Sequence, residues 1–498
     1  MKPEVTIAQE AGISMGGFVF GQLFRFGYNL AAARLLGADA LGIYALVVGV
    51  VQVAEVIATG GLDAGMLRFV NLHDGEARRR VIASAMKRSA ISSVAVSLLL
   101  ILLSAPIAGL LHGGTLLRFA LCTAAAAIPF SVLTLVAGHA VQAFRKLAPK
   151  IVASQMISPA AFLILMVAAR FTLGGDAALV LPFVPSALLA FLWIWPRFRT
   201  TTGIRIDDVL QARGDRAMTT FAMPLLAVSL FSMFSHWIDI MMLGLLTDAH
   251  TVGLYQPAAR TAGLLRAVLL AFSGIAAPMI AGYHGRQELG EIRNLYGLVT
   301  RWILTIVMLP ALILFFFPVE VLSVFGRGFD AGSAALVMLA ASALLQAWFG
   351  LGSTVLAMSG AERLSFVNQT VALAAQVLLH LLLIPRFGLN GAAFSTLAVT
   401  VLLTLIRMVE LRSLYGIWPV PVKVWKPLVA GGVAGALLLM IKPLLAPMPP
   451  LQALSIGTVS AAAVYLFLIR LFRLEQEEME VILKFVPFFD KHPTNNTP

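Results

Sequence analysis

The sequence contains one cysteine, few charged residues and none of the short motifs that mark common catalytic centres. Cys122 is alone among 498 residues, which excludes a disulfide framework and a cysteine-based metal site. No Walker A, HExxH or CxxC motif occurs, so the chain encodes neither an ATPase engine nor a metalloenzyme of these classes. Charged residues make up 12%, whereas 59% are hydrophobic and the mean hydropathy is +0.91. Such a composition indicates a membrane protein.

Long apolar segments recur along the whole chain. One crossing of the hydrocarbon core needs about 20 mostly apolar residues. Fourteen such segments begin near residues 12, 40, 89, 115, 150, 175, 219, 251, 299, 331, 364, 389, 427 and 451. We therefore predict an all-α integral membrane protein with about 14 transmembrane helices. The first segment has no small-residue cleavage site, so we expect a retained helix and not a signal peptide.

The positive charges indicate how these segments are oriented. Of the 36 Lys and Arg residues, 27 fall on the side of the N-terminus, six on the opposite side and three within segments. The positive-inside rule then predicts that both termini are cytoplasmic. The net charge of +12 reflects this topology and contact with anionic membrane lipids, so no nucleic-acid partner is expected. Because every outer loop is short, a polymerase or ligase with catalytic residues in a large outer loop is excluded, and we predict no enzyme.

Two halves of the chain repeat one another. RLLGADALGIYAL in the first half resembles MLGLLTDAHTVGLYQ in the second, with Gly42 aligned to Gly253 and Tyr44 to Tyr255 at an offset of 211. RFTLGGDAALV likewise matches RFGLNGAAFST at an offset of 216. Six segments separate the copies and six is even, so the sequence predicts two parallel six-helix repeats followed by two C-terminal helices.

The repeat also predicts how the chain is divided. The expected parts are an N-terminal six-helix lobe (1–198), a cytoplasmic linker (199–217), a C-terminal six-helix lobe (218–414), helices 13 and 14 (415–470) and a cytoplasmic amphipathic tail (471–498). A short amphipathic helix is expected within the linker around residues 204–210, lying at the membrane interface.

Three motifs resemble a known family. ARLLGADALGIYAL, GLYQPAARTAGLL and LLLIPRFGLNGAAFSTL are similar to segments of the polysaccharide-transporter and O-antigen flippase branch of the multidrug/oligosaccharidyl-lipid/polysaccharide exporter superfamily. Each motif is loose, but their order and spacing extend over nearly the whole chain. The resemblance implies a plasma (cell inner) membrane flippase for polyprenyl-pyrophosphate-linked oligosaccharides, such as precursors of the O-antigen of lipopolysaccharide, of an exopolysaccharide or of a similar glycan. It also implies a V-shaped central cavity and alternating access.

The same resemblance leaves several alternatives open. The superfamily also contains drug and metabolite-cation antiporters, so the fold does not settle the substrate. A flippase implies a lipid-linked oligosaccharide and membrane lipids as partners, no cofactor, and an ion gradient or the membrane potential as the energy source. Candidate further partners are H⁺ or Na⁺ and a glycan polymerase or biosynthetic complex. The glycan and the oligomeric state stay open.

Polar residues inside the apolar segments form stripes. Residues three, four or seven positions apart share one helix face. Inserting a charged side chain at the centre of a span costs about 2.5–3.5 kcal/mol, so each such residue is expected to have a functional or structural role. The first, second, seventh and eighth segments each have one polar face, as expected for the walls of a shared aqueous cavity. The residues on these faces that we predict to bind substrate are Gln22, Arg25, Asn29, Gln52, Glu55, Gln256 and Arg260.

Arg25 and Arg260, one from each half, suit a pyrophosphate. A guanidinium stays charged, and its planar fork engages phosphate oxygens bidentately. The resemblance supports this role, since the related lipid II flippase also has cavity arginines in its first and eighth helices. The alternative role is structural, with Arg25 paired to Glu55 and Arg260 paired to Asp239 as buried ion pairs.

A second set of residues is a candidate site for the coupling ion. In the lipid II flippase, an Asp of helix 7, an Asn/Asp pair of helix 11 and a Thr of helix 12 form a cation site. Asp239, Gln376, His380 and Thr396 look like the matching positions. His380 stands where the second carboxylate would be, which disfavours a sodium shell of hard oxygens and favours a proton. The alternative is a histidine bonded to backbone inside a helix bundle.

Overall fold

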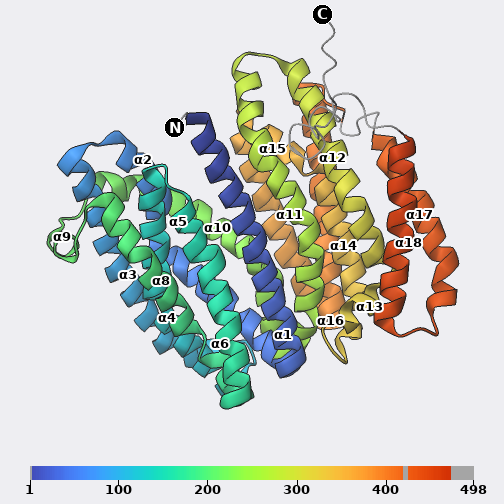
Figure 1. Ribbon diagram of the computed structural model, residues 1–498, viewed down its shortest axis with the longest axis horizontal. Coiled ribbons are helices and arrows are strands. Elements are labelled where there is room, and N and C mark those ends of the chain that lie inside the picture. The colour runs from blue at the N-terminus through green and yellow to red at the C-terminus, as the bar shows by residue number, and fades with distance from the viewer. Residues whose placement is uncertain (1–2, 419–423, 473–498) are drawn as a thin grey trace, which may run out of the picture. The chain divides into compact units, whose positions relative to one another are not determined.

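The computed structural model describes residues 3–418 and 424–472, and the regular structure of these residues is helical (Figure 1). The helices of the first half are α1 (Pro3–Thr59), α2 (Leu62–Leu72), α3 (Gly75–Leu110), α4 (Gly114–Ala143), α5 (Ala148–Ile151), the π-helix η1 (Val152–Ile157), α6 (Ser158–Thr172), α7 (Gly175–Val180), α8 (Phe183–Thr202) and α9 (Ile206–Gln211). The others are α10 (Arg216–Leu246), α11 (Ala249–Gly285), α12 (Leu289–Phe316), α13 (Pro318–Ser323), the 3₁₀ helix η2 (Phe329–Gly332), α14 (Ser333–Phe349), α15 (Leu351–Met358), α16 (Glu362–Tyr415), α17 (Trp425–Leu445) and α18 (Pro450–Leu471).

The helices of the described residues provide about fourteen membrane crossings. Twelve helices are long and apolar enough to cross a membrane. Two of them, residues 20–59 and 363–415, have 40 and 53 residues, enough for two crossings each at about 1.5 Å per residue. Gly37 (φ 85°, ψ −177°) and Gly388 (φ 54°, ψ −130°) bend these two helices, because only glycine adopts such positive φ values easily. The predicted multi-pass all-α membrane fold is confirmed.

The contacts divide the chain into two compact units. The first contains residues 1–260, 322–335 and 373–396, and the second contains the remainder. Each unit is therefore built from segments far apart in the sequence. The V-shaped cavity and the lobe boundaries inferred from the sequence stay predictions. The amphipathic tail predicted for 471–498 lies outside the described residues beyond Phe472.

A reciprocal glycine contact in the first unit shows the internal repeat in three dimensions. A Cβ atom on Gly42 would lie 1.7 Å from the carbonyl oxygen of Ala249, and one on Gly253 would lie 1.8 Å from that of Ala38. Both pairs of positions are related by the offset of 211. The backbones of α1 and α11 thus approach each other through equivalent residues, which only glycine permits.

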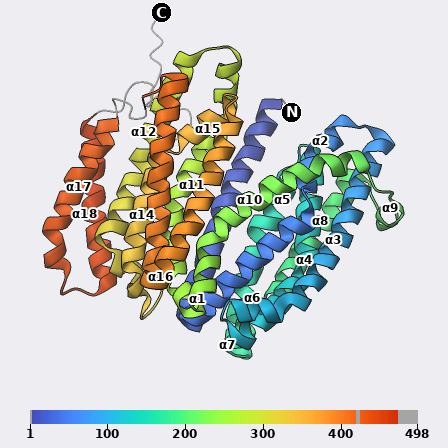
Figure 2. The same cartoon turned by 180° about the vertical axis from the view of Figure 1, so that it is seen from behind.

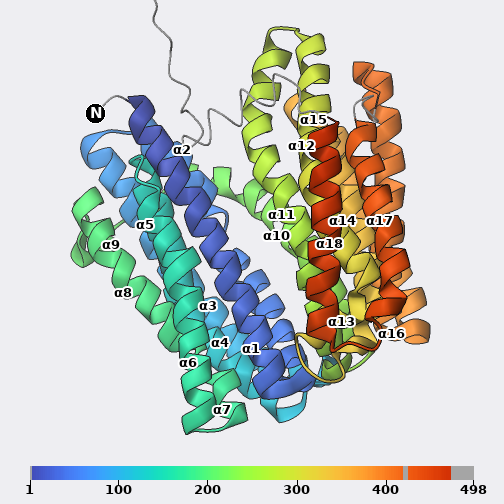
Figure 3. The same ribbon diagram turned by 45° about the vertical axis from the view of Figure 1, so that its right-hand side comes forward.

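In the first unit, α1 lies beside α5 and α6, which Figure 3 shows from the side. The span of residues 148–172 is interrupted by η1, whose wider turns precede Pro159. Such π-helical turns frequently occur at functional sites. The short helix α9 lies within the predicted linker and packs against α3 (Figure 2).

The second unit contains the C-terminal hairpin of α17 and α18 (Figure 1). Phe317 packs against Leu438 of α17 and Ala461 of α18. Ala430 and Ala434 of α17 face Met308 of α12. Small residues on α17 let it approach α12 closely, which is how transmembrane helices gain van der Waals contact without a hydrophobic driving force.

Candidate functional site

A polar cavity of about 540 Å³ lies within the first unit. Its wall combines residues of α1, α4, η1, α6, α8, α10 and α11. Six of the seven predicted substrate-binding residues line it, namely Gln22, Arg25, Asn29, Gln52, Glu55 and Arg260. The helical spacing of the sequence stripes therefore places these side chains around one space, as expected for polar residues inside a membrane protein.

The two cavity arginines are held differently. Arg25 of α1 has a half-buried side chain, and its carbonyl oxygen accepts a 2.7 Å hydrogen bond from the amide of Asn29. The guanidinium carbon of Arg260 lies 5.1 Å from the centre of the Trp237 ring, a cation–π distance. Trp237 in turn donates a 3.0 Å hydrogen bond from Nε1 to Oε1 of Gln52. The aromatic ring thus helps to hold Arg260 beside the cavity without neutralising its charge.

The ion pair between Arg25 and Glu55, considered as an alternative role, is not formed among the described residues. Glu55 accepts a hydrogen bond from the hydroxyl of Ser131, and no salt bridge joins it to Arg25. The lining of the cavity contains two guanidinium groups, Arg25 and Arg260, and one carboxyl group. The fixed charge of the cavity is therefore favourable to an anion.

Gln256, the seventh predicted residue, lies behind the cavity wall. Its side chain is fully buried, and its Nε2 donates a 3.3 Å hydrogen bond to Oδ1 of Asn29. This contact joins α11 to α1 and orients the Asn29 amide, whose nitrogen donates to the Arg25 carbonyl. Gln256 is placed to position a cavity residue, not to touch a ligand in the cavity.

The sequence stripes missed the aromatic part of the wall. Tyr28, Tyr44 and Phe162 line the cavity, and the centres of the Tyr28 and Tyr44 rings are 4.2 Å apart. Ser131 of α4 and Ser154 of η1 also contribute hydroxyl groups. The aligned tyrosines of the repeat were a signal for Tyr44, but nothing in the spacing of α4 or η1 points to their serines.

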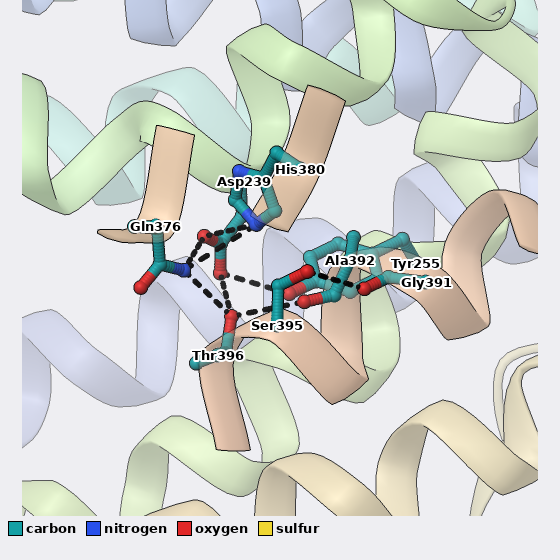
Figure 4. Close-up of polar contacts among 8 residues, drawn as sticks. All are labelled: Asp239, Tyr255, Gln376, His380, Gly391, Ala392, Ser395 and Thr396. Carbon is teal, nitrogen blue, oxygen red and sulfur yellow. Dashed lines mark hydrogen bonds and ion pairs between the residues drawn. The ribbon is translucent and has the colours of Figure 1, made fainter. Parts of the chain in front are cut away.

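The four predicted coupling-ion residues converge in the first unit (Figure 4). Oδ1 of Asp239 accepts a 2.8 Å hydrogen bond from Nε2 of Gln376 and lies 3.5 Å from Nε2 of His380. Oδ2 accepts a 3.0 Å hydrogen bond from the Thr396 hydroxyl and a 2.9 Å bond from the hydroxyl of Tyr255. Three donors thus hold one carboxylate, and Tyr255 was not among the predicted members.

This polar cluster (Asp239, Tyr255, Gln376, His380 and Thr396) brings one carboxylate and one imidazole together with three hydrogen-bond donors. His380 is fully buried, and its ring nitrogen faces the carboxylate. Nε2 of Gln376 donates a hydrogen bond to the carboxylate and also lies 3.0 Å from the Thr396 hydroxyl oxygen. Among the described residues, no group of three His, Cys, Asp or Glu side chains is placed to share a metal ion.

Comparison with known proteins assigns the chain to a family. The family model described as polysaccharide biosynthesis protein matches residues 7–284, more than half of the sequence. The chain belongs to the polysaccharide biosynthesis protein family. This membership confirms the resemblance to the polysaccharide-transporting branch that the sequence motifs indicated. A search among curated proteins finds no significant match.

Solved structures show the same fold. The lipid II flippase MurJ in an inward closed conformation aligns with a TM-score of 0.75 at 13% identity, covering 92% of this chain and 98% of that protein. An inward-facing multidrug resistance MATE family transporter of the MOP superfamily aligns with a TM-score of 0.69 at 16% identity, covering 80% and 94%. A point mutant of the Vibrio cholerae MATE transporter VcmN gives a TM-score of 0.55 at 16% identity, covering 83% and 100%. A lipid II flippase and two MATE transporters thus have the fold of this chain.

Proposed function

We propose that this protein is a flippase that carries a polyprenyl-pyrophosphate-linked oligosaccharide across the plasma (cell inner) membrane by alternating access. The observation that carries the proposal is the pair of guanidinium groups, Arg25 and Arg260, in one polar cavity of a chain from the polysaccharide biosynthesis family. Arginine is suited to a pyrophosphate because its fork binds two oxygens at once and stays charged. The headgroup would cross through the cavity while the prenyl tail stays in lipid.

The size of the cavity bears on how much of the cargo it contacts. About 540 Å³ is within the usual range for pockets that enclose one small ligand. It suits a pyrophosphate with the adjoining sugar better than a whole oligosaccharide. The hydroxyl and amide groups of Gln22, Gln52 and Ser154 are typical partners for sugar hydroxyls. Recognition would therefore concentrate on the pyrophosphate and the sugar next to it, not on the outer part of the glycan.

The polar cluster is our candidate for coupling transport to an ion gradient. Asp239 and His380 would take up a proton on one side and release it on the other, with Gln376 and Thr396 orienting the carboxylate. The membrane potential offers a second energy source. Moving a net negative headgroup outward across an inside-negative membrane is favoured by about 2.3 kcal/mol per charge per 100 mV.

The proposal is tested by the lipid pool of cells that lack the protein but keep their glycosyltransferases. Mass spectrometry should detect accumulation of one polyprenyl-pyrophosphate oligosaccharide, and the wild-type gene should reverse it. Arg25→Ala and Arg260→Ala should fail to do so, since losing a buried charged contact costs about 2–5 kcal/mol, a rate loss of at least about thirtyfold. Arg25→Lys keeps the charge and should restore part of the activity.

Arg266 supplies the matched control. It lies on α11 six residues beyond Arg260, its side chain is exposed, and it does not line the cavity. Arg266→Ala removes the same charge from the same helix and should reverse the accumulation like the wild type. An unchanged lipid pool in the deletion strain would contradict the flippase.

A drug or metabolite-cation antiporter is the second candidate, and the polar cluster is the observation that favours it. A carboxylate held by three donors inside a bundle suits a cation-driven exporter, and MATE transporters share the fold. Under this function, deletion would leave the lipid pool unchanged and raise sensitivity to cationic drugs, with Asp239→Asn reproducing the deletion. The positive cavity argues against it.

A further inference from the structure

A second cavity in the first unit lies outside the candidate site, where α3 meets the loop between α9 and α10. Its volume is about 330 Å³, and three of its lining residues are cations, Lys87, Arg88 and Arg213. Here α3 contacts the part of the linker between α8 and α10 (residues 203–215), and Figures 1 and 2 both show α9 beside α3.

Two of the three cations, Lys87 and Arg88, donate hydrogen bonds to neutral acceptors. Nζ of Lys87 donates to the carbonyl oxygens of Leu210 at 2.6 Å and Ala212 at 3.0 Å. A guanidinium nitrogen of Arg88 donates to the hydroxyl of Thr219. In the described part of the chain, no carboxylate lines the cavity and none of its three cations forms a salt bridge. Carbonyl and hydroxyl groups orient these cations but leave their charge uncompensated, so an anion would be attracted to the cavity.

The sequence of α3 places this cavity at the depth of lipid headgroups. From Ile91 to the end of α3 at Leu110 there are 20 residues, about 30 Å of helix, which equals the thickness of the hydrocarbon core. Lys87 and Arg88 precede this apolar stretch by one turn. Basic pockets between transmembrane helices are typical sites for anionic lipid headgroups.

An apolar stripe continues from the cavity along α3. Ile91, Leu98 and Leu102 are 62%, 61% and 76% exposed, and their spacing of seven and four residues puts them on one helix face. Ser84 and Arg88 precede them on the same face. A molecule with its anionic group among the cations would therefore have its hydrocarbon chain along this stripe. A free phosphate would use only the cavity.

We propose that this cavity binds the headgroup phosphate of an anionic glycerophospholipid, with its acyl chains along the exposed stripe of α3. Because Lys87 and Arg88 belong to α3 and Arg213 to the linker, the lipid phosphate braces the segment that connects the two repeats. This site is separate from the cargo cavity and does not depend on the proposed function: the two cavities share no lining residue.

Native mass spectrometry of the purified full chain tests the proposal by titration with phosphatidylglycerol and, separately, with zwitterionic phosphatidylethanolamine. The wild type should bind phosphatidylglycerol more tightly. Arg213→Gln should weaken this binding about fivefold, since one basic residue near a membrane surface contributes about 1 kcal/mol. Arg213 is exposed, so this variant should fold normally, and its unfolding temperature without lipid should match the wild type. Arg88→Gln should weaken binding at least as much.

Arg80→Gln is the matched control. Arg80 is an exposed cation on α3 outside the cavity, so its loss changes the net charge equally. An equal loss of binding in Arg80→Gln would mean general surface attraction and would overturn the site. Polyprenyl phosphate binding that falls in Arg213→Gln, with phosphatidylglycerol binding unchanged, would overturn the phospholipid assignment. Inorganic phosphate that binds as tightly as the lipid would overturn the role of the stripe.

Discussion

The two repeats are built from corresponding helices, but two aligned positions have aromatic side chains in the first repeat and a hydrogen-bonded carboxylate in the second. At the offset of 211, Tyr28 corresponds to Asp239 and Tyr44 to Tyr255. In the first repeat, the Tyr28 ring packs 4.2 Å from that of Tyr44 and 4.8 Å from that of Phe162, centre to centre. In the second repeat, Tyr255 donates a hydrogen bond to Asp239 at the corresponding place. An aromatic cluster and a polar cluster thus occupy matching positions.

The two repeats thus share a backbone contact, and at the aligned positions 28 and 239 only the second repeat has a carboxylate. A buried carboxylate is costly unless donors surround it. The second repeat supplies such donors from α11 and from both parts of α16, whereas the first repeat fills the space with rings. We therefore expect substitutions that disturb the backbone contact to lower stability equally in both repeats. Substitutions of the aligned side chains should lower transport in the second repeat only.

Substitutions at the glycine contact between α1 and α11 should give the largest losses of stability. Gly42→Ala and Gly253→Ala would each place a Cβ within 2 Å of a carbonyl oxygen of the other repeat. Each should lower the free energy of unfolding by about 3 kcal/mol, because the helices must separate. Thermal unfolding of the purified variants measures this loss.

Gly109→Ala is the control for that pair. Gly109 lies within α3, and a Cβ atom added there would meet no other atom within 4 Å, so alanine should be neutral or stabilise by about 0.5–1 kcal/mol. If only one of Gly42→Ala and Gly253→Ala lowers the free energy of unfolding, the contact between these glycines is not a shared feature of the two repeats.

Asp239→Asn tests whether the polar cluster carries the coupling. The amide keeps the shape but removes the charge that Tyr255, Gln376 and Thr396 stabilise. Transport in proteoliposomes should fall about tenfold and lose its response to an imposed pH gradient, since hydrogen bonds to a charged group contribute about 1.5–3 kcal/mol. Cargo binding should be unchanged. A variant that keeps its response to the gradient would remove Asp239 from the coupling site.

Tyr44 and Tyr255, which are aligned in the repeat, allow a matched comparison in which the expected change in transport rate is smaller. Tyr255→Phe removes a hydrogen bond to the Asp239 carboxylate and should reduce gradient-driven transport about fivefold. Tyr44→Phe leaves the aromatic contacts in place and should change transport by less than about twofold. Initial rates in the same liposomes measure both. Equal effects would mean that the two clusters do not differ in function.

Asp248 lies between α10 and α11, and its substitution should give the smallest loss of stability, one that depends on pH. Hydrogen bonds from the backbone and side chain of Thr251 lower the pKa of Asp248 below its ordinary value. The folded state therefore favours the carboxylate, so its stabilisation is present above the unfolded pKa and is lost as pH falls below about 4. Asp248→Ala should lower the stability of α11 by about 1 kcal/mol at pH 7.

The equivalent position in the first repeat, Gly37, has no side chain to supply such a cap, so this pH effect should be confined to the second repeat. Unfolding temperatures of the wild type and Asp248→Ala at pH 7 and at about pH 2.5, well below the unfolded pKa of about 3.9, measure it. A difference between the two proteins that persists undiminished at the lower pH would show that Asp248 does not act as a carboxylate cap.

The sequence predicted most of the fold because hydropathy and charge are read directly from the chain. The fourteen segments follow from length and composition, although Gly37 and Gly388 join two pairs of them into long bent helices. The stripes also placed Arg25 and Arg260 correctly on one cavity, because helical spacing determines which residues share a face.

The roles of the remaining site residues could not be predicted, because they depend on contacts between segments far apart in the sequence. Tyr255 could not be assigned to Asp239, since a tyrosine on an apolar face usually packs as an aromatic ring. Gln256 shares the stripe of Arg260 yet turns toward Asn29, because the rotation of α11 is set by its close contact with α1. The π-helix η1 has no sequence signal apart from Pro159.

Binding to the purified protein measures whether the cavity arginines hold the pyrophosphate of the cargo. Native mass spectrometry should compare polyprenyl pyrophosphate with polyprenyl phosphate on the wild type and on Arg25→Ala. We predict that the wild type prefers the pyrophosphate and that Arg25→Ala weakens its binding at least about thirtyfold, with Arg266→Ala unchanged. Equal affinity of the wild type and Arg25→Ala for the pyrophosphate would show that Arg25 does not hold the cargo.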